Sequence, residues 1–234
     1  MIRKILALVI ILNFTACAEL QQVIDQLPEE VGISESEIGS GLRQALDLGI
    51  DKQVTKLTQK DGFFKNDLVK IVLPEELKKV DKALRDIGLS SLADEGLKVL
   101  NRAAEDAVSE ATPIFVSAVK DITFADAKNI LLGNDDAATQ YLTSKTQTAL
   151  YAKFNPVIKN SFNKVGADQI WANLINKYNT IPFTSNVNPD LTDYVTGEAL
   201  NGVYKMIAVE EKEIRSKTAS RTTDLLRKVF ALQD

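Results

Sequence analysis

The spacing of apolar residues is the feature that most constrains the fold of this chain. From about residue 35 to residue 230 they recur at intervals of three and four, as in Ile38, Leu42, Ala45 and Leu46. That spacing is typical of one buried face of an α-helix, whereas runs that alternate apolar and polar residues, as strands require, do not occur in the sequence. The sequence therefore predicts an all-α protein with a single, bundle-like domain of about eight helices.

Turn and capping residues predict where some of these helices begin and end. Thr123 with Asp126 three residues later has the pattern of an N-cap and its returning carboxylate. Asp135 or Asp136 is expected to cap the helix that begins at Ala137.

Two prolines predict distortions of longer helices. Pro113 lies within a periodic stretch from Ser91 to Val119 and predicts a kink there. The pair Asn155-Pro156 predicts a break or a bend in the helix that starts at Ala137.

The N-terminus resembles a bacterial export signal. Arg3 and Lys4 precede an uninterrupted apolar run from Ile5 to Leu12. As a helix this run would cover about 12 Å, far short of the ~30 Å hydrocarbon core of a bilayer. The run therefore predicts a leader for export and not a membrane-spanning segment.

The only cysteine follows this leader. The small residues Thr15 and Ala16 lead directly into Cys17, which is the pattern of a lipoprotein signal. Phe14 departs from it, because an aliphatic residue is usual there. We expect Cys17 to be the acylated first residue of the mature chain, with fatty chains such as palmitate. Ordinary cleavage nearby and an uncleaved anchor are the alternatives.

This interpretation divides the chain into three parts: a lipoprotein signal peptide over 1–16, a lipidated cysteine and tether over 17–34, and a helical domain over 35–234. Several acyl chains would hold the protein at a membrane without crossing it. Ala18, and no aspartate, follows the cysteine. By analogy with lipoprotein sorting, this favours export and the periplasmic face of the outer membrane.

Composition argues against several classes of function. The chain has 28 basic and 32 acidic residues, so its formal charge of −4 is not that of a nucleic-acid-binding protein. It contains no histidine, which removes the commonest general base and zinc ligand. We therefore expect no catalytic residue, no metal site, no cofactor and no enzymatic activity.

Polar residues occur on two faces that the helical period assigns to the core. On one, Asn101 lies between Leu97 and Ala104, with Glu105 one turn later and Arg102 within reach of Glu105. On the other, Glu210 follows the spacing of Val203, Ile207 and Ile214. A buried carboxylate must be paired, protonated or ligated.

Three arginines are the candidate partners of Glu210: Arg102, Arg215 and Arg221. The main interpretation is a buried polar network that fixes how two long helices are aligned. A ligand pocket and a carboxylate metal or acid–base site are the alternatives. Metal sites in helical bundles normally use Glu-x-x-His pairs, and this chain lacks histidine.

Eight segments in order resemble one bacterial envelope family. They are DGFFKN (61–66), LPEELKKV (73–80), NRAAEDA (101–107), AATQYL (137–142), YNTIP (178–182), NPDLTDYVT (188–196), ALNGVYKMIAVEEKEIR (199–215) and RTTDLLRKVF (221–230). The sequence is thereby similar to the family catalogued as domain of unknown function 4197, over about residues 35–230. The resemblance implies an exported, mostly helical, lipid-anchored protein with no assigned activity.

Three functions remain open. The first is a non-enzymatic envelope lipoprotein that binds a protein partner or has a structural role. The second is a carrier for a small amphiphile, which requires a cavity of ~300 Å³ or more between the helices. The residues expected to line it are Phe63, Phe64, Trp171 and Tyr204, with Asn101, Arg102 or Glu105 at its mouth. The third is a carboxylate-dependent hydrolase, which requires two converging acidic groups.

Overall fold

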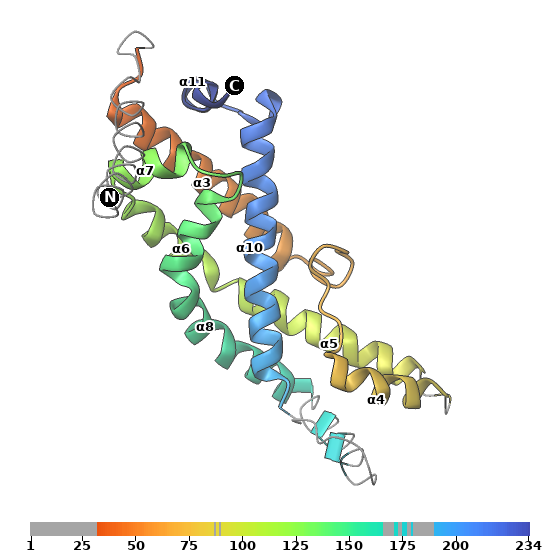
Figure 1. Cartoon of the computed structure of the whole chain (residues 1–234). Coiled ribbons are helices and arrows are strands. Elements are labelled where there is room, and N and C mark those ends of the chain that lie inside the picture. The colour runs from red at the N-terminus through yellow and green to blue at the C-terminus, as the bar shows by residue number, and fades with distance from the viewer. Residues whose placement is uncertain are drawn as a thin grey trace, which may run out of the picture. The chain divides into compact units, whose positions relative to one another are not determined.

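The computed structural model describes residues 32–86, 88, 90–165, 171–172, 175–176, 179 and 190–234 (Figure 1). Cys17, the leader and most of the tether lie outside this range. Residues 35–234 form one compact unit. Its helices are α3 (Glu35–Thr58), α4 (Glu75–Asp86), α5 (Ser90–Val108), α6 (Ala111–Lys120), α7 (Phe124–Leu131), α8 (Ala137–Val165), α10 (Thr192–Ser216) and α11 (Asp224–Phe230), with short 3-10 turns at Thr218–Ser220 and Ala231–Gln233. The residues described contain no strand, so the prediction of an all-α domain is confirmed.

Helix α10 packs against three of the other helices. It runs along α8, α3 and α5 in the middle of the body (Figure 1). Val195, Ala199, Val203 and Ile207 lie on its buried side, at the spacing of a single helical face. Their burial is the main source of hydrophobic stabilisation along the long axis of this helix.

A non-helical segment between α3 and α4 also contributes to the core. It turns at Asp61, whose φ of 71° is in the left-handed region, and its Phe63 and Ile71 side chains are fully buried. Phe63 packs against Gly202 of α10, where a Cβ atom would lie only 2.6 Å from the phenylalanine ring. The close approach of the two elements therefore depends on glycine at position 202.

The structure corrects the helix expected around Pro113 and shows no break at Pro156. The predicted helix from Ser91 to Val119 is two helices, because α5 ends at Val108 and α6 begins at Ala111. Pro113 then lies in the first turn of α6, where its missing N–H has no intrahelical partner to lose. Helix α8, in contrast, runs through Pro156 without a break.

Packing explains why α8 continues past its proline. Phe154 and Ile158, on either side of Pro156, are both fully buried. Pro156 itself is exposed, so its ring occupies the solvent side of the helix. Burial on both sides of the proline holds α8 in one piece, although local propensity favours a break.

The cap at the start of α7 is confirmed. The Asp126 N–H donates to the Thr123 hydroxyl at 3.1 Å, and the Thr123 N–H donates to the Asp126 carboxylate at 3.0 Å. These two bonds form a complete capping box. The hydrogen bond from the Thr123 hydroxyl lowers the pKa of Asp126.

Two glycines in α10 give a matched test of the packing at Phe63. Gly197→Ala meets no atom within 4 Å, so we expect about 0.5 to 1 kcal/mol of added stability from reduced backbone entropy. Gly202→Ala would clash with Phe63 and Val69, and we expect a net loss of about 1 to 2 kcal/mol. Denaturant unfolding of both variants measures the difference. Equal stabilities would contradict the close approach at Gly202.

Candidate functional site

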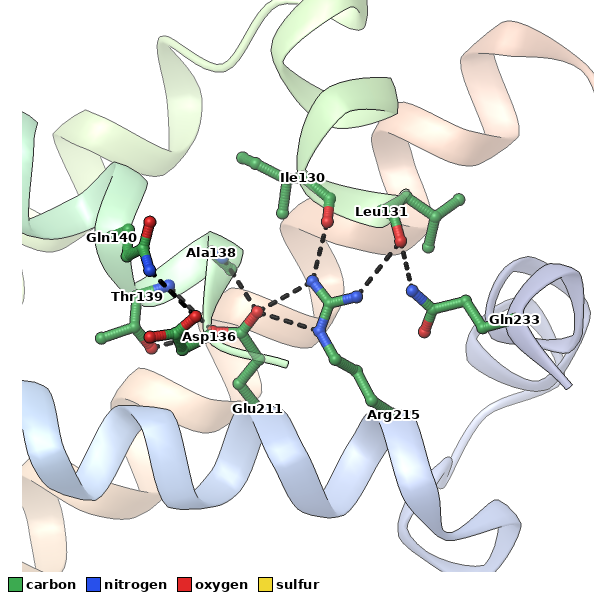
Figure 2. Close-up of polar contacts among 9 residues, drawn as sticks. All are labelled: Ile130, Leu131, Asp136, Ala138, Thr139, Gln140, Glu211, Arg215 and Gln233. Atoms are coloured by element: carbon green, nitrogen blue, oxygen red, sulfur yellow. Dashed lines mark hydrogen bonds and ion pairs between the residues drawn. The ribbon is translucent and has the colours of Figure 1, made fainter. Parts of the chain in front are cut away.

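The most extensive buried polar cluster lies where α7 ends and α8 begins, under the C-terminal half of α10. The Glu211 carboxylate accepts hydrogen bonds from the N–H groups of Ala138 and Thr139, both at 2.8 Å, and from the Thr139 hydroxyl at 2.8 Å (Figure 2). The first N–H groups of a helix lack intrahelical partners and carry partial positive charge. A carboxylate from α10 therefore caps the start of α8.

Arg215 completes this cluster from one turn further along α10. Its guanidinium donates to the carbonyl oxygens of Ile130 at 2.8 Å and Leu131 at 3.1 Å, at the end of α7 (Figure 2). The Ile130 carbonyl also accepts the N–H of Gly133, and the Leu131 carbonyl also accepts the side-chain amide of Gln233. It also forms an ion pair with Glu211 at 2.8 Å, and both residues are more than 90% buried. The pair thus binds the end of one helix and the start of the next.

This arrangement shows that the predicted cap of α8 is wrong. The Asp136 side chain accepts a hydrogen bond from Gln140, and Asp135 lies 3.7 Å from the ammonium of Lys212. The capping carboxylate is Glu211, 73 positions from Ala138 in sequence. A local pattern cannot identify a cap that arrives from another helix.

A second cluster holds the non-helical segment against α5. Asn101 is fully buried and accepts the N–H of Ile71 at 2.8 Å, while its amide donates to the carbonyls of Ile71 and Leu97, both at 2.8 Å. Glu105 accepts the N–H groups of Phe63 at 3.1 Å and Phe64 at 3.4 Å. Both side chains satisfy backbone groups that would otherwise be buried without partners.

Arg102 connects this second cluster to the turn. Its guanidinium forms ion pairs with both Glu105 and Asp61. A hydrogen bond from Lys65, together with the charge of Arg102, lowers the pKa of Asp61. Arg102 and Glu105 are therefore paired and hold the turn and the start of the buried segment, whereas the hydrogen bonds of Asn101 go to Ile71 and Leu97.

Glu210 belongs to a third cluster and has none of its predicted arginine partners. Its carboxylate accepts hydrogen bonds from Lys52 at 2.7 Å and from the Gln53 amide at 2.8 Å, both on α3. Arg102 and Arg215 have the other partners given above. Lysine and glutamine from α3 could not be assigned to Glu210 before the packing of α3 on α10 was known.

Arg221 forms a fourth cluster at the end of α10. It is 1% exposed and donates to the carbonyls of Ile214 at 3.0 Å and Arg215 at 2.8 Å. It also binds both carboxylate oxygens of Asp234 at 2.7 Å, and this contact lowers the pKa of Asp234. Arg221 thus links the last carbonyls of α10 to the C-terminal segment.

The six predicted polar residues are therefore buried or half-buried in four separate clusters and do not form one site. Glu211, the carboxylate of the largest cluster, was missed. Its position four residues before Arg215 was a usable signal, because residues at that spacing are neighbours on a helix. The apolar period directs Glu210 inward and gives no such signal for its neighbour Glu211.

Comparison with known proteins assigns a family to this arrangement. Residues 32–231 match the family described as a protein of unknown function, DUF4197. The chain belongs to this family. Searches of curated proteins and of solved structures find no match. The family assignment confirms the resemblance drawn from the eight motifs, whereas acylation of Cys17 stays a prediction because the matched range begins after it.

The interior of the DUF4197 body beside Glu210 and Glu211 is nearly filled. The hollow that these two side chains line with Leu46, Gly49 and Ile207 has a volume of about 20 Å³, which is room for about one water molecule. Among the residues described, no group of three or more acidic side chains is placed to hold a metal ion. Chemically, this arrangement supplies hydrogen-bond partners to buried backbone groups and neutralises buried charged side chains.

The aromatic residues expected to line a ligand cavity are packed instead. Phe63 and Trp171 are buried, and Trp171 lies against Gly96. Tyr204 packs edge-on against Phe115, its hydroxyl hydrogen-bonds Thr146 at 2.7 Å, and burial raises its pKa. Phe64 is half-buried beneath the ammonium of Lys70.

Replacement of Glu211 tests the α7–α8 junction of the DUF4197 domain. Glu211→Gln leaves Arg215 buried without a counter-charge and places an amide N–H₂ where a carboxylate accepted bonds. We expect a loss of about 3 kcal/mol or more in the free energy of unfolding. Glu213→Gln is the matched control, because Glu213 pairs with Lys217 at the surface and is expected to change stability by less than about 1 kcal/mol. Similar losses in both variants would contradict the assigned role of Glu211.

The turn at Asp61 predicts a dependence on pH. Because its pKa is lowered in the folded state, the Asp61 carboxylate stabilises the fold at neutral pH. That contribution is lost as the pH falls below the ordinary range of aspartate, near 4, through the folded pKa. Asp61→Asn retains a side chain that tolerates positive φ, and we expect it to reduce the acid sensitivity of unfolding. Asp67→Asn in the same loop is the control. If the free energy of unfolding falls with acid as steeply in Asp61→Asn as in the wild type, the prediction is refuted.

Proposed function

We propose that this chain is an envelope lipoprotein, anchored to a membrane through Cys17, whose helical body has a non-enzymatic role in binding a protein partner or supporting an envelope assembly. The observation that supports a non-enzymatic role is that the buried carboxylates already have hydrogen-bond or ion-pair partners within the fold. Glu105, Glu210 and Glu211 are each committed to contacts that hold the fold together.

A carboxylate-dependent hydrolase would need two acidic groups that converge on one substrate. Glu210 and Glu211 line one hollow, but it has room for only about one water molecule. Glu210 is bound by Lys52 and Gln53, and Glu105 and Glu211 accept backbone N–H groups. This division of roles favours a scaffold over a catalyst.

A carrier function has less support, because the hollow beside Glu210 is far smaller than an amphiphile requires. A larger hollow of about 560 Å³ between α6 and α8 contains none of the residues expected to line the cavity, and Asp121, Asp126 and Lys145 contribute to its lining.

The surface of the body offers apolar side chains for contact with a partner. Of the large apolar residues described, six are more than a third exposed: Leu48, Leu68, Val72, Leu132, Tyr151 and Val209. Leu48, Leu132, Tyr151 and Val209 come from four different parts of the chain, whereas Leu68 and Val72 are four positions apart in one segment. Singly exposed apolar residues are normal on a protein surface, and a contiguous patch is what marks an interface. Leu68 and Val72 are therefore the first places to look for partner contact.

Attachment rests on the sequence that precedes the body. The positively charged start, the run from Ile5 to Leu12 and the small residues before Cys17 together favour acylation of that cysteine. No helix in the described part of the chain has both the length and the apolar character to cross a bilayer. Two or more acyl chains on Cys17 would give stable anchoring, at about 0.8 kcal/mol for each buried methylene.

Metabolic labelling with a fatty-acid probe tests the anchor. We expect the wild-type chain to incorporate the probe and to fractionate with the outer membrane, because Cys17 is the only thiol available. Cys17→Ser should abolish incorporation. Equal labelling of wild type and Cys17→Ser would refute acylation at this residue.

A further inference from the structure

The segment that follows the middle of α3 has a charge opposite to that of the chain as a whole. Residues 52–70 contain five lysines and two aspartates, in a protein with a formal charge of −4. The lysines are Lys52, Lys56, Lys60, Lys65 and Lys70, of which Lys52 pairs with Glu210 and Lys65 with Asp61. A local positive surface on an acidic chain predicts attraction to an anionic partner.

Part of this segment surrounds a surface hollow of about 470 Å³. Its lining includes Lys56, Lys60, Lys65, Asp61 and Asp67. Asp61 is neutralised by Lys65 at 3.0 Å and by Arg102. Lys56 and Lys60 have no ion-pair partner among the residues described, and neither has Asp67. Three lysines and two aspartates line the hollow, so its positive charges exceed its negative charges by one.

Apolar side chains are exposed in the same segment. Leu68 lines the hollow and is 49% exposed, and Val72 is 51% exposed. Their neighbours Val69 and Ile71 are buried, so alternate residues of the segment point inward and outward. The exposed leucine and valine thus share a short stretch with the exposed Lys70.

Buried side chains hold the backbone of this segment in place. Asn101 and Glu105 bind the backbone of Ile71, Phe63 and Phe64, and the side chain of Asn66 accepts the N–H of Leu68 at 3.2 Å. Leu68 is therefore presented outward on an anchored backbone. A surface fixed in this way loses little conformational entropy when it binds.

We propose that the basic loop face, defined as Lys56, Lys60, Lys65, Leu68 and Val72, contacts the anionic phospholipid surface of the membrane that carries the chain. This inference rests on the proposed attachment through Cys17. A free anion would use the lysines alone, whereas a membrane surface accommodates the lysines at its headgroups and the two apolar side chains just below them.

The length of the tether allows this orientation. The basic loop face begins at the far end of α3 from the tether, and 24 residues of helix span about 36 Å. The 17 residues between Cys17 and Glu35 reach about 60 Å at full extension. The tether is therefore long enough for the loop face to lie on the membrane.

Hydrogen–deuterium exchange of the full-length chain on vesicles tests the proposal. The chain is reconstituted into phosphatidylcholine vesicles with or without phosphatidylglycerol, and exchange is followed in peptides that cover residues 65–73. Each lysine near an anionic surface contributes about a fivefold change in equilibrium. We therefore expect exchange in this segment to slow by about fivefold or more on the anionic vesicles, and the effect to shrink at high salt.

Charge reversal supplies the matched comparison. Lys56→Glu with Lys60→Glu should remove the protection, whereas Lys153→Glu with Lys164→Glu, exposed on α8, should leave it intact. Exchange in α10 reports whether each variant keeps its fold. Equal exchange on the two vesicle types, or equal loss in both pairs of variants, would overturn the proposal.

Two further measurements distinguish failure of the loop-face proposal from binding of a free anion and from absence of the lipid anchor. Inorganic phosphate without vesicles should not protect residues 65–73, and protection by phosphate alone would assign the surface to a free anion instead. The mass of the acyl group on Cys17 is measured in the same sample. A chain without it refutes the proposed anchor. The loop face is still decided by the comparison of vesicles, because a chain without the acyl group can be added to preformed vesicles and its exchange compared with and without phosphatidylglycerol.

Discussion

The structure depends on how the buried ends of α7 and α8 are satisfied. A helix ends in unpaired carbonyls and begins with unpaired N–H groups, and here both ends lie beneath α10. Glu211 and Arg215 have opposite charges, one helical turn apart, and each binds the helix end of opposite polarity. Their pairing fixes where α10 lies relative to the α7–α8 connection, and the hydrophobic contacts of α10 follow from that position.

The same principle organises the rest of the interior. Asn101 and Glu105 bind the backbone of the segment between α3 and α4, and Arg221 binds the last carbonyls of α10. Polar side chains that hold a fold in this way leave the interior with little capacity for ligands. This is consistent with the proposed function, in which the partner and membrane contacts lie on the surface.

Sequence was sufficient where the deciding interactions are local. The apolar period predicted the all-α fold, and Thr123 with Asp126 predicted a cap, because both depend on neighbours within one or two turns. Sequence was insufficient where contacts between residues far apart in the chain determine the structure. Glu211 caps a helix 73 positions away, Glu210 pairs with α3, and burial of Phe154 and Ile158 keeps α8 continuous through Pro156. Those outcomes depend on tertiary packing, which overrides local preference.

The most direct test is native-state hydrogen exchange at two amides. Ala138 and Thr139 lie in the first turn of α8, where amide protons are normally unprotected for want of an intrahelical acceptor. Because Glu211 accepts both, the account predicts that they exchange as slowly as the core of α10 and open only with large-scale unfolding. Exchange as fast as that of exposed loop amides would contradict the central role of Glu211.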